Sequence, residues 1–460
     1  MKKQQRQMHI LVTFFACLVF CAFQGAEASV GAQFPELDLK ASPTPAPDFT
    51  WTLEQVLDIA QKQNPDVKEA KFNFEAASKT IVQARSGYLP SADISGSYEQ
   101  TNLPYPSAGL NNQLGTVLPY SSVVARIHQT IFDFGKTLST IEARSADTES
   151  AGQTTMVLKN TISLHAEMAF FNVRAAEKLV EVAREGVAKF DETLRRTAVL
   201  VRTGTRPQFD LSQANVELSK AKLSLTNAEN ISDLAKVTLL NIMGLPQDST
   251  FTLVEPSPSE IVEMQRLKLP SLDDLALANR PEIKQSESAI KSSQALLHRE
   301  YLDFLPTISL EGWYGQFYPS YPTSINDAWG GGVTLTWNVF DGLKTMGRTD
   351  ELAARLGAQG SRFERQRQNI LAEVAQSYMN LKKDEISLQV AHESLAYAVE
   401  NARLAKKRYE ADVATFLELL VAETSLLDAQ AGDVQARYQY EIGLASLENA
   451  VNLPMKEILK

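Results

Sequence analysis

The sequence has little cysteine and no excess of positive charge. Its two cysteines, Cys17 and Cys21, both lie close to the N-terminus, so we expect the rest of the chain to fold without disulfide bonds. Lysine and arginine number 45 against 55 aspartate and glutamate residues, and a chain this acidic is poorly suited to bind a phosphate backbone. We therefore expect no nucleic acid partner. Glycine, proline and aromatic residues occur at ordinary levels, which excludes a disordered or collagen-like chain.

The sequence also lacks an apolar run long enough for a membrane helix. The N-terminal run, residues 10–23, is shorter than the ~20 residues that such a helix requires. Basic residues precede this run and Ala26-Glu27-Ala28 follows it, which is the order of a signal peptide and its cleavage site. We predict that residues 1–28 are a signal peptide and that the protein is exported.

A lipid anchor at Cys21 is the alternative for this segment. Leu18 to Cys21 loosely matches a lipobox, but Phe20 is bulky where that motif has a small residue, so the plain signal peptide is favoured. The next segment, residues 29–50, is predicted to be an extended linker because it contains four prolines: Pro35, Pro43, Pro45 and Pro47.

The remaining sequence is written twice. Short motifs recur in the same order in two blocks, which we take as residues 51–246 and 270–454. The motifs pair as Asn64-Pro65 with Arg280-Pro281, Leu89-Pro90 with Leu305-Pro306, Phe132-Asp133-Phe134-Gly135 with Phe340-Asp341-Gly342, and Leu245-Pro246 with Leu453-Pro454. This duplication predicts one architecture built from two similar halves.

Each half is predicted to contain one very long helix. Apolar residues from Ile162 to Val201 recur at steps of three and four, which is typical of a coiled-coil seam, and residues 135–201 contain no proline. Two shorter helices, 65–85 and 205–243, are predicted to stack end to end beside it. The second half repeats this plan with helices 281–300, 342–411 and 415–449. Asp384 and Asp433 interrupt its seams, which favours a layered assembly with a water-facing side.

Between the helices the apolar period changes to two, which predicts strands. Residues 123–131 and 333–339 alternate in this way, and 92–98 and 307–318 are expected to be their hairpin partners. Flanking tyrosine and tryptophan residues fit the pattern of an outer-membrane barrel, with two hairpins in a soluble α+β core as the alternative. Four strands are fewer than the ~8 of the smallest barrels, so several chains must contribute.

Taken together, the motifs resemble the TolC family of outer-membrane channel proteins over residues 51–454. The duplicated motifs above carry the resemblance, together with Gly204-Thr205-Arg206 ahead of Asp210, and Gly244-Leu245-Pro246. The resemblance implies a mainly α fold in which a homotrimer forms a twelve-stranded β-barrel in the outer-membrane lipid and an α-helical barrel in the periplasm, with an equatorial belt made of the short helices and the termini. It also implies partners, namely a periplasmic adaptor protein and an inner-membrane efflux pump or ABC transporter.

No catalytic constellation, cofactor motif or metal-ligand spacing is found, so the protein is predicted not to be an enzyme. The informative positions are the turns between the helices. In the first copy the turn contains Gly204, Thr205 and Arg206, and in the second it ends in Thr415, with Glu418 at capping-box spacing. In the resembled family these turns form the periplasmic tip.

Three acids near these turns are candidates for a periplasmic gate, namely Asp210, Asp412 and Glu418. The alternative is a local role, because Glu418 can complete a capping box and Asp210 can stabilise a helix N-terminus. The second copy has Ala414 where the first has Arg206, so a ring of acids is favoured over a salt-bridged latch.

The predicted function is that of a passive exit duct for small molecules. Type I protein secretion is an alternative, since a duct surrounds whatever its transporter delivers, and a non-conducting periplasmic coiled-coil scaffold is another. The sequence does not identify the transported substrate.

Overall fold

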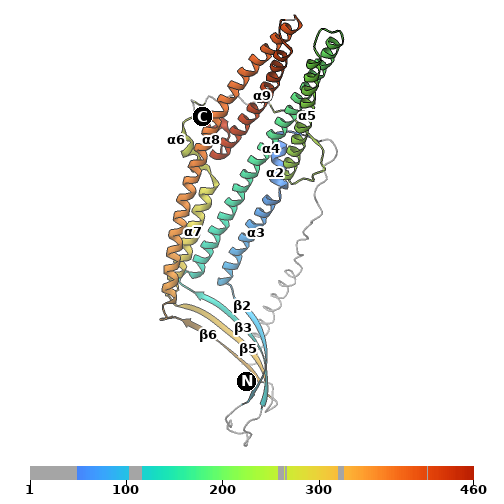
Figure 1. Cartoon of the computed structure of the whole chain (residues 1–460). Coiled ribbons are helices and arrows are strands. Elements are labelled where there is room, and N and C mark those ends of the chain that lie inside the picture. The colour runs from blue at the N-terminus through green and yellow to red at the C-terminus, as the bar shows by residue number, and fades with distance from the viewer. Residues whose placement is uncertain are drawn as a thin grey trace. The chain divides into compact units, whose positions relative to one another are not determined.

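The computed structural model describes residues 49–102, 117–256, 264, 267–319, 326–411 and 413–459, all within one unit of the chain (Figure 1). The order helix, strand, strand, long helix, helix occurs twice in it. The first copy consists of α3 (Pro65–Arg85), β2 (Ser91–Asn102), β3 (Val117–Phe132), α4 (Lys136–Arg202) and α5 (Gln208–Met243). The second consists of α7 (Pro281–Leu302), β5 (Thr307–Pro319), β6 (Asn326–Thr336), α8 (Lys344–Glu410) and α9 (Phe416–Val451).

The two long helices, α4 and α8, each contain 67 residues, which confirms the prediction of one very long helix per copy. Each begins three residues after the aspartate of its strand-to-helix motif. The Asp133 carboxylate accepts hydrogen bonds from the backbone N–H groups of Gly135 (3.0 Å) and Thr137 (2.7 Å). Asp341 does the same for Thr345 (2.9 Å) in the second copy. These acids therefore cap the free N–H groups at the start of each helix.

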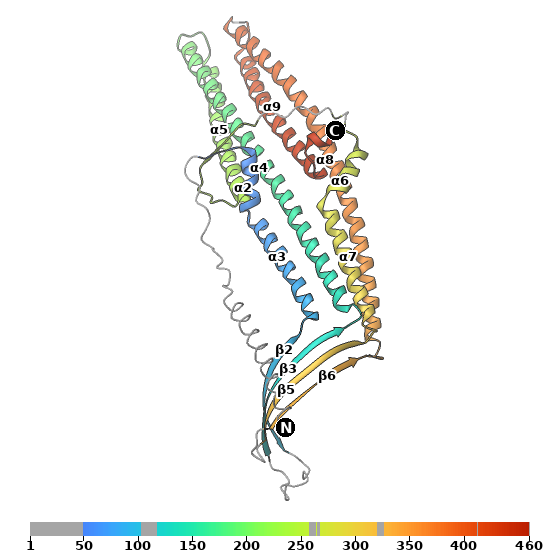
Figure 2. The same ribbon diagram turned by 180° about the vertical axis from the view of Figure 1, so that it is seen from behind.

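The shorter helices lie along α4 in succession, as predicted. The hydroxyl of Thr148 donates to the carbonyl oxygen of Ala77 in α3 at 3.1 Å. Further along α4, Arg184 lies 3.2 Å from Glu229 of α5. Helix α4 also contacts α7 and α9, so among the helices it is the one through which the two copies meet (Figures 1 and 2).

The residue before each helix-starting proline performs the same task in both copies. In the first, the amide of Asn64 donates to the carbonyl oxygen of Ile242 near the end of α5 at 2.9 Å. In the second, the guanidinium of Arg280 donates to the carbonyl oxygen of Ala450, the equivalent residue of α9, at 3.1 Å. The duplication therefore preserves the carbonyl acceptor while the donor changes from an amide to a guanidinium.

The four strands form one antiparallel sheet in the order β2-β3-β5-β6. The copies are joined by the pairing of β3 with β5, and among the described residues β2 and β6 each have an edge without a partner strand. The expected strand 333–339 is confirmed for residues 333–336, but β6 begins earlier and ends at Thr336, and the indole of Trp337 donates to the carbonyl oxygen of Phe304 at 3.0 Å.

The glycines 330–332 lie inside β6, ahead of the expected strand 333–339. At Gly330, glycine makes room for the side chain of Trp313 on the neighbouring strand. A Cβ atom at Gly330 would lie 2.7 Å from the indole Nε1 of Trp313, so only glycine leaves room for that ring.

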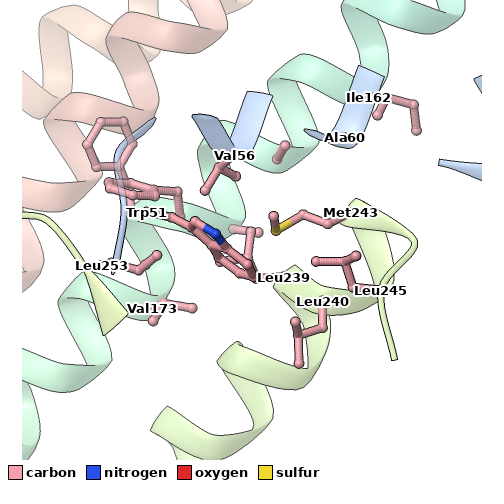
Figure 3. Packing of buried hydrophobic residues seen from close by; sticks show 14 of the residues in the cluster. Trp51, Val56, Ala60, Ile162, Val173, Leu239, Leu240, Met243, Leu245 and Leu253 are labelled. Atoms are coloured by element: carbon pink, nitrogen blue, oxygen red, sulfur yellow. The ribbon is translucent and has the colours of Figure 1, made fainter. Parts of the chain in front are cut away.

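A belt of small elements lies beside the middle of the long helices, and the sequence did not locate its individual strands and helices. Strands β1 (Phe49–Trp51) and β4 (Phe251–Leu253) pair in parallel. Helices α2 (Leu53–Gln63), α6 (Leu269–Asn279) and α10 (Met455–Ile458) complete it. Figure 3 shows the core here, where Trp51 packs among Val56, Val173, Leu239 and Met243.

The expectation of a water-facing side at Asp384 is wrong. Asp384 is only 2% exposed and points at Gly443 of α9, where a Cβ atom would lie 2.9 Å from its Oδ2. Neither carboxylate oxygen has a hydrogen bond, although Lys383 Nζ lies 3.0 Å from Oδ1. The missing side chain at Gly443 is what lets this acid enter the interface. Asp433 is less buried and lies 3.5 Å from His392 Nδ1.

Candidate functional site: the helix turns and the groove between the copies

The turn from α4 to α5 is closed by backbone hydrogen bonds. The N–H groups of Thr205 and Arg206 both donate to the carbonyl oxygen of Leu200, at 2.9 and 3.3 Å. Gly204 has a φ of 78°, a conformation that glycine adopts without strain. Glycine is therefore the residue that this position of the turn accommodates without strain.

The turn from α8 to α9 is closed in the same way. Val413 and Ala414 donate through their N–H groups to the carbonyl oxygen of Arg408, at 2.9 and 3.2 Å. The hydroxyl of Thr415 then accepts a hydrogen bond from the N–H of Glu418 at 3.2 Å, which begins α9. Asp412 lies outside the described residues.

The two described gate candidates have different surroundings. Asp210, in the first turn of α5, is 9% exposed. Glu418, in the first turn of α9, is exposed and lies 3.7 Å from Arg408. The Thr415 hydroxyl caps the N–H of Glu418, but the Glu418 carboxylate lies 3.3 Å from that hydroxyl and not on the Thr415 N–H, so the reciprocal half of the expected capping box is not formed.

An aromatic contact links the two turns within the chain. The guanidinium of Arg206 lies over the ring of Tyr409, with Cζ 4.8 Å from the ring centre. Tyr409 in turn lies 5.9 Å from Phe416, measured between ring centres. The sequence reasoning did not select Tyr409, because nothing in its local pattern indicates a partner about two hundred residues away in the chain.

Next to the turns, between the two copies, lies a cavity of about 710 Å³. Its walls are the last turns of α4 and α8, and α9 contributes the apolar side chains of Leu419 and Leu426. The walls carry charges of both signs, and Arg196 of α4 lies 3.2 Å from Glu410 of α8. The charged lining residues are Glu185, Lys189, Glu192, Arg196, Arg206, Arg403, Lys406, Glu410 and Glu423.

Glu423 is the most buried acid of this groove, at 7% exposure. The hydroxyl of Thr193 lies 3.4 Å from its Oε2. Burial raises the pKa of Glu423, while the positive charges of Lys189 and Lys406 oppose that rise. The groove therefore contains a buried carboxylate, and each of its two walls places one lysine near it, Lys189 from α4 and Lys406 from α8.

Within the part of the chain that the structure describes, no helix is long and apolar enough to cross a membrane. The same residues contain no group of three or more histidine, cysteine or acidic side chains placed to hold a metal ion. The features described above are the two helix turns and the groove beside them, which offer apolar and charged side chains for contact.

A family model described as "Outer membrane efflux protein" matches residues 56–245 and 272–453. The chain belongs to this family. The two matched segments together cover more than half of the sequence, and outer-membrane location follows from membership.

Individual relatives are distant but cover most of the chain. The chain is 22% identical to the antibiotic efflux pump outer membrane protein ArpC of Pseudomonas putida, over 97% of this chain and 94% of that protein. It is 22% identical to outer membrane protein TolC of Escherichia coli, over 87% and 82%. The solved structure of the outer membrane protein VceC of Vibrio cholerae shares the fold, with a TM-score of 0.73 at 16% identity over 87% and 96%.

Proposed function

We propose that three copies of this chain form an exit duct that carries small molecules through the outer membrane. The observation that carries this proposal is the sheet with two open edges. An edge of unpaired N–H and C=O groups is not tolerated in lipid, and pairing β6 of one chain with β2 of the next chain removes every edge. Three chains supply twelve strands, which is a size that membrane barrels adopt.

The exposed faces of the helices support the same assembly. Large apolar side chains recur every seven residues along α5 at Phe209, Val216 and Leu223, and all three are exposed. Helix α8 carries a similar exposed stripe at Val390, Tyr397 and Leu404. Stripes with this spacing are typical of coiled-coil packing. We infer that α5 of one chain packs against α8 of the next chain, so that the helices also form a ring, which extends into the periplasm.

The groove near the turns fits a helical partner. The groove has an apolar floor and walls that carry charges of both signs, so it matches a helix whose side presents apolar and charged side chains. We propose that a periplasmic adaptor docks there and connects the duct to an inner-membrane pump. ArpC is named as part of an antibiotic efflux pump, which favours small molecules as cargo. Type I secretion would use the same duct with an ABC transporter.

We retain 51–246 and 270–454 as the proposed limits of the two repeats.

Deletion of residues 326–336, the edge strand β6, tests the assembly. We expect the variant to lose both trimer formation and channel activity in planar bilayers, because one edge of each sheet loses its partner. The sedimentation coefficient in detergent and the single-channel current are the measurements. A wild-type protein that is a folded monomer in detergent, or that conducts no ions as a trimer, would refute the proposed duct.

The gate is proposed at Asp210, Asp412 and Glu418, each of which would occur three times around the trimer axis. Acids that converge on a narrow pore favour cations. We expect Asp210→Asn and Glu418→Gln, singly and together, to lower cation selectivity in planar bilayers. Glu229→Gln, on the side of α5 that faces Arg184, is the matched control. If selectivity is unchanged in every variant, these acids serve only as helix caps.

A further inference from the structure

The helices next to the sheet are ordered like its strands. They lie side by side as α3, α4, α7 and α8, an order that matches β2-β3-β5-β6 (Figures 1 and 2). The contact of α4 with α7 joins the two copies in this layer, as the pairing of β3 with β5 does in the sheet. Helices α3 and α8 are therefore its outer members. In the proposed ring, α8 of one chain lies next to α3 of the next chain.

Side-chain contacts between α4 and the second copy show which positions face each other at this join. At the start of α4, the ammonium group of Lys136 donates to the carbonyl oxygen of Leu305 at 2.9 Å and to the hydroxyl of Thr307 at 3.3 Å. Further along, the amide of Gln285 in α7 donates to the hydroxyl of Thr154 in α4 at 2.8 Å. The equivalent positions should face each other between chains, because the duplication repeats these helices.

The equivalents of the second contact carry opposite charges. Thr154 corresponds to Arg362, since each occupies the same position of its 67-residue helix. Gln285 corresponds to Glu69, since each occupies the same position after the proline that begins its helix. Both Arg362 and Glu69 are exposed, and neither side chain forms a hydrogen bond or ion pair with another described residue. Because an arginine is longer than a threonine, its guanidinium group can reach across the join.

The equivalents of the first contact are again a lysine and its acceptors. Lys344 begins α8 as Lys136 begins α4, and it is exposed. Leu89 and Ser91 stand where the second copy has its two acceptors, so a carbonyl oxygen and a hydroxyl are available at the end of α3 and the start of β2. The acid beside Lys136, Asp303 at 3.5 Å, has a glycine as its equivalent, so this contact alone brings no charge pair to the join between chains.

We propose that Arg362 forms an ion pair with Glu69 of the next chain and that this pair selects the face on which a second copy docks. The inference rests on the proposed ring, because only there do α8 and α3 of different chains meet. The charges have a reason to occur between chains rather than within one. The join between the copies forms inside a single chain, whereas the join between chains depends on encounter, and opposite charges favour the correct face of the partner over others.

Charge reversal in the full-length protein tests the ion pair. Arg362→Glu and Glu69→Arg each place like charges at every join between chains, so we expect either single variant to dissociate about tenfold faster than the wild-type trimer in detergent. The double reversal restores opposite charges and should return the rate to within about twofold of the wild type. Arg355→Glu is the matched control and should leave the rate unchanged, because its partner Glu351 lies in the same helix at 2.5 Å.

Thiol cross-linking gives a second readout that does not depend on stability. Both cysteines of the sequence lie in the predicted signal peptide, so the mature chain has no thiol of its own. A short bis-maleimide should join the double variant Arg362→Cys, Glu69→Cys into a covalent ring of three chains. The double variant Arg348→Cys, Glu69→Cys should give no ring, because residue 348 lies about 20 Å from residue 362 along α8.

The two readouts separate failure of the ion pair from failure of the duct. If the wild type is a trimer, a double reversal that dissociates as fast as the single variants, or the absence of the covalent ring, overturns the ion pair and leaves the duct standing. A wild-type protein that sediments as a monomer in detergent refutes the ring itself, and the ion pair with it.

Discussion

Replacing Glu167 by glutamine should stabilise the protein above neutral pH and leave it unchanged in acid. Glu167 lies on α4 opposite α9. Burial is the main cause that raises the pKa of Glu167 from the ordinary 4.5 to about 7, and the negative charges of Glu448 and Glu441 add to this rise. Three cations of the neighbouring elements are already paired with other acids. Arg174 and Arg437 bind Glu255, and Lys62 of α2 binds Asp58.

The direction with pH follows from this raised pKa. Below about pH 4.5 the folded and unfolded chains both hold the proton, so the wild type and Glu167→Gln should be equally stable. As the pH rises from 4.5 to about 7 the unfolded chain releases its proton more readily, and the wild type loses stability. Above pH 7 the full difference is present. Because the side chain is partly exposed, we expect about 2 kcal/mol in favour of the variant.

Melting temperatures of the wild type and Glu167→Gln, measured from pH 4 to pH 8.5, check this expectation. The two curves should coincide in acid and separate toward neutral pH. The pH profile of Glu181→Gln, which changes an exposed acid of the same helix, should run parallel to that of the wild type. Parallel curves for Glu167→Gln as well would show that this carboxyl titrates normally in the folded protein.

The second large effect is expected for Gly244→Ala at the end of α5. Gly244 has a φ of 70°, and a Cβ atom there would lie 2.9 Å from the carbonyl oxygen of Gln63 and 3.3 Å from Cα of Asn64. These are backbone atoms, so a rotamer change cannot relieve the contact. The left-handed conformation costs an alanine about 1 kcal/mol, and the clash adds about 1 to 3 kcal/mol.

Gly204→Ala provides a matched control for this substitution. Gly204 has a φ of 78°, and no atom lies within 4 Å of the position its Cβ would take. This variant should therefore lose only the conformational part, about 1 kcal/mol. Denaturation midpoints of the two variants measure the difference. Equal losses at the two positions would mean that the backbone around Gln63 moves aside at little cost.

The sequence allowed the long helices to be predicted because their signals are local. Proline positions and apolar steps of three and four residues mark α3, α4 and α7 to within a few residues. The belt elements α2 and α6 were missed, because each has only 11 residues and is held by contacts with distant helices.

Side-chain partners across the two copies were harder to predict than the elements themselves. The acid at Asp384 suggested a water-facing position, and only the pairing of α8 with α9 reveals that Gly443 makes room for it. Glu255 carried no signal at all, because its partners Arg174 and Tyr438 are brought together by the tertiary fold. The candidate gate could be located to the turns from helix ends alone, but the turns do not by themselves define a pore.

The pairing of β3 with β5 inside one chain has a consequence for the symmetry of the proposed ring. The join between the copies within a chain is an antiparallel strand pair, and in the proposed ring the join between chains would be one too, so that ring would approach sixfold symmetry. The copies differ in sequence, however, as Asn64 and Arg280 illustrate. In such a ring two kinds of groove would alternate around the axis, one within each chain and one between neighbouring chains. A partner helix would meet unlike binding surfaces at successive positions, so we expect its occupancy to follow threefold rather than sixfold symmetry.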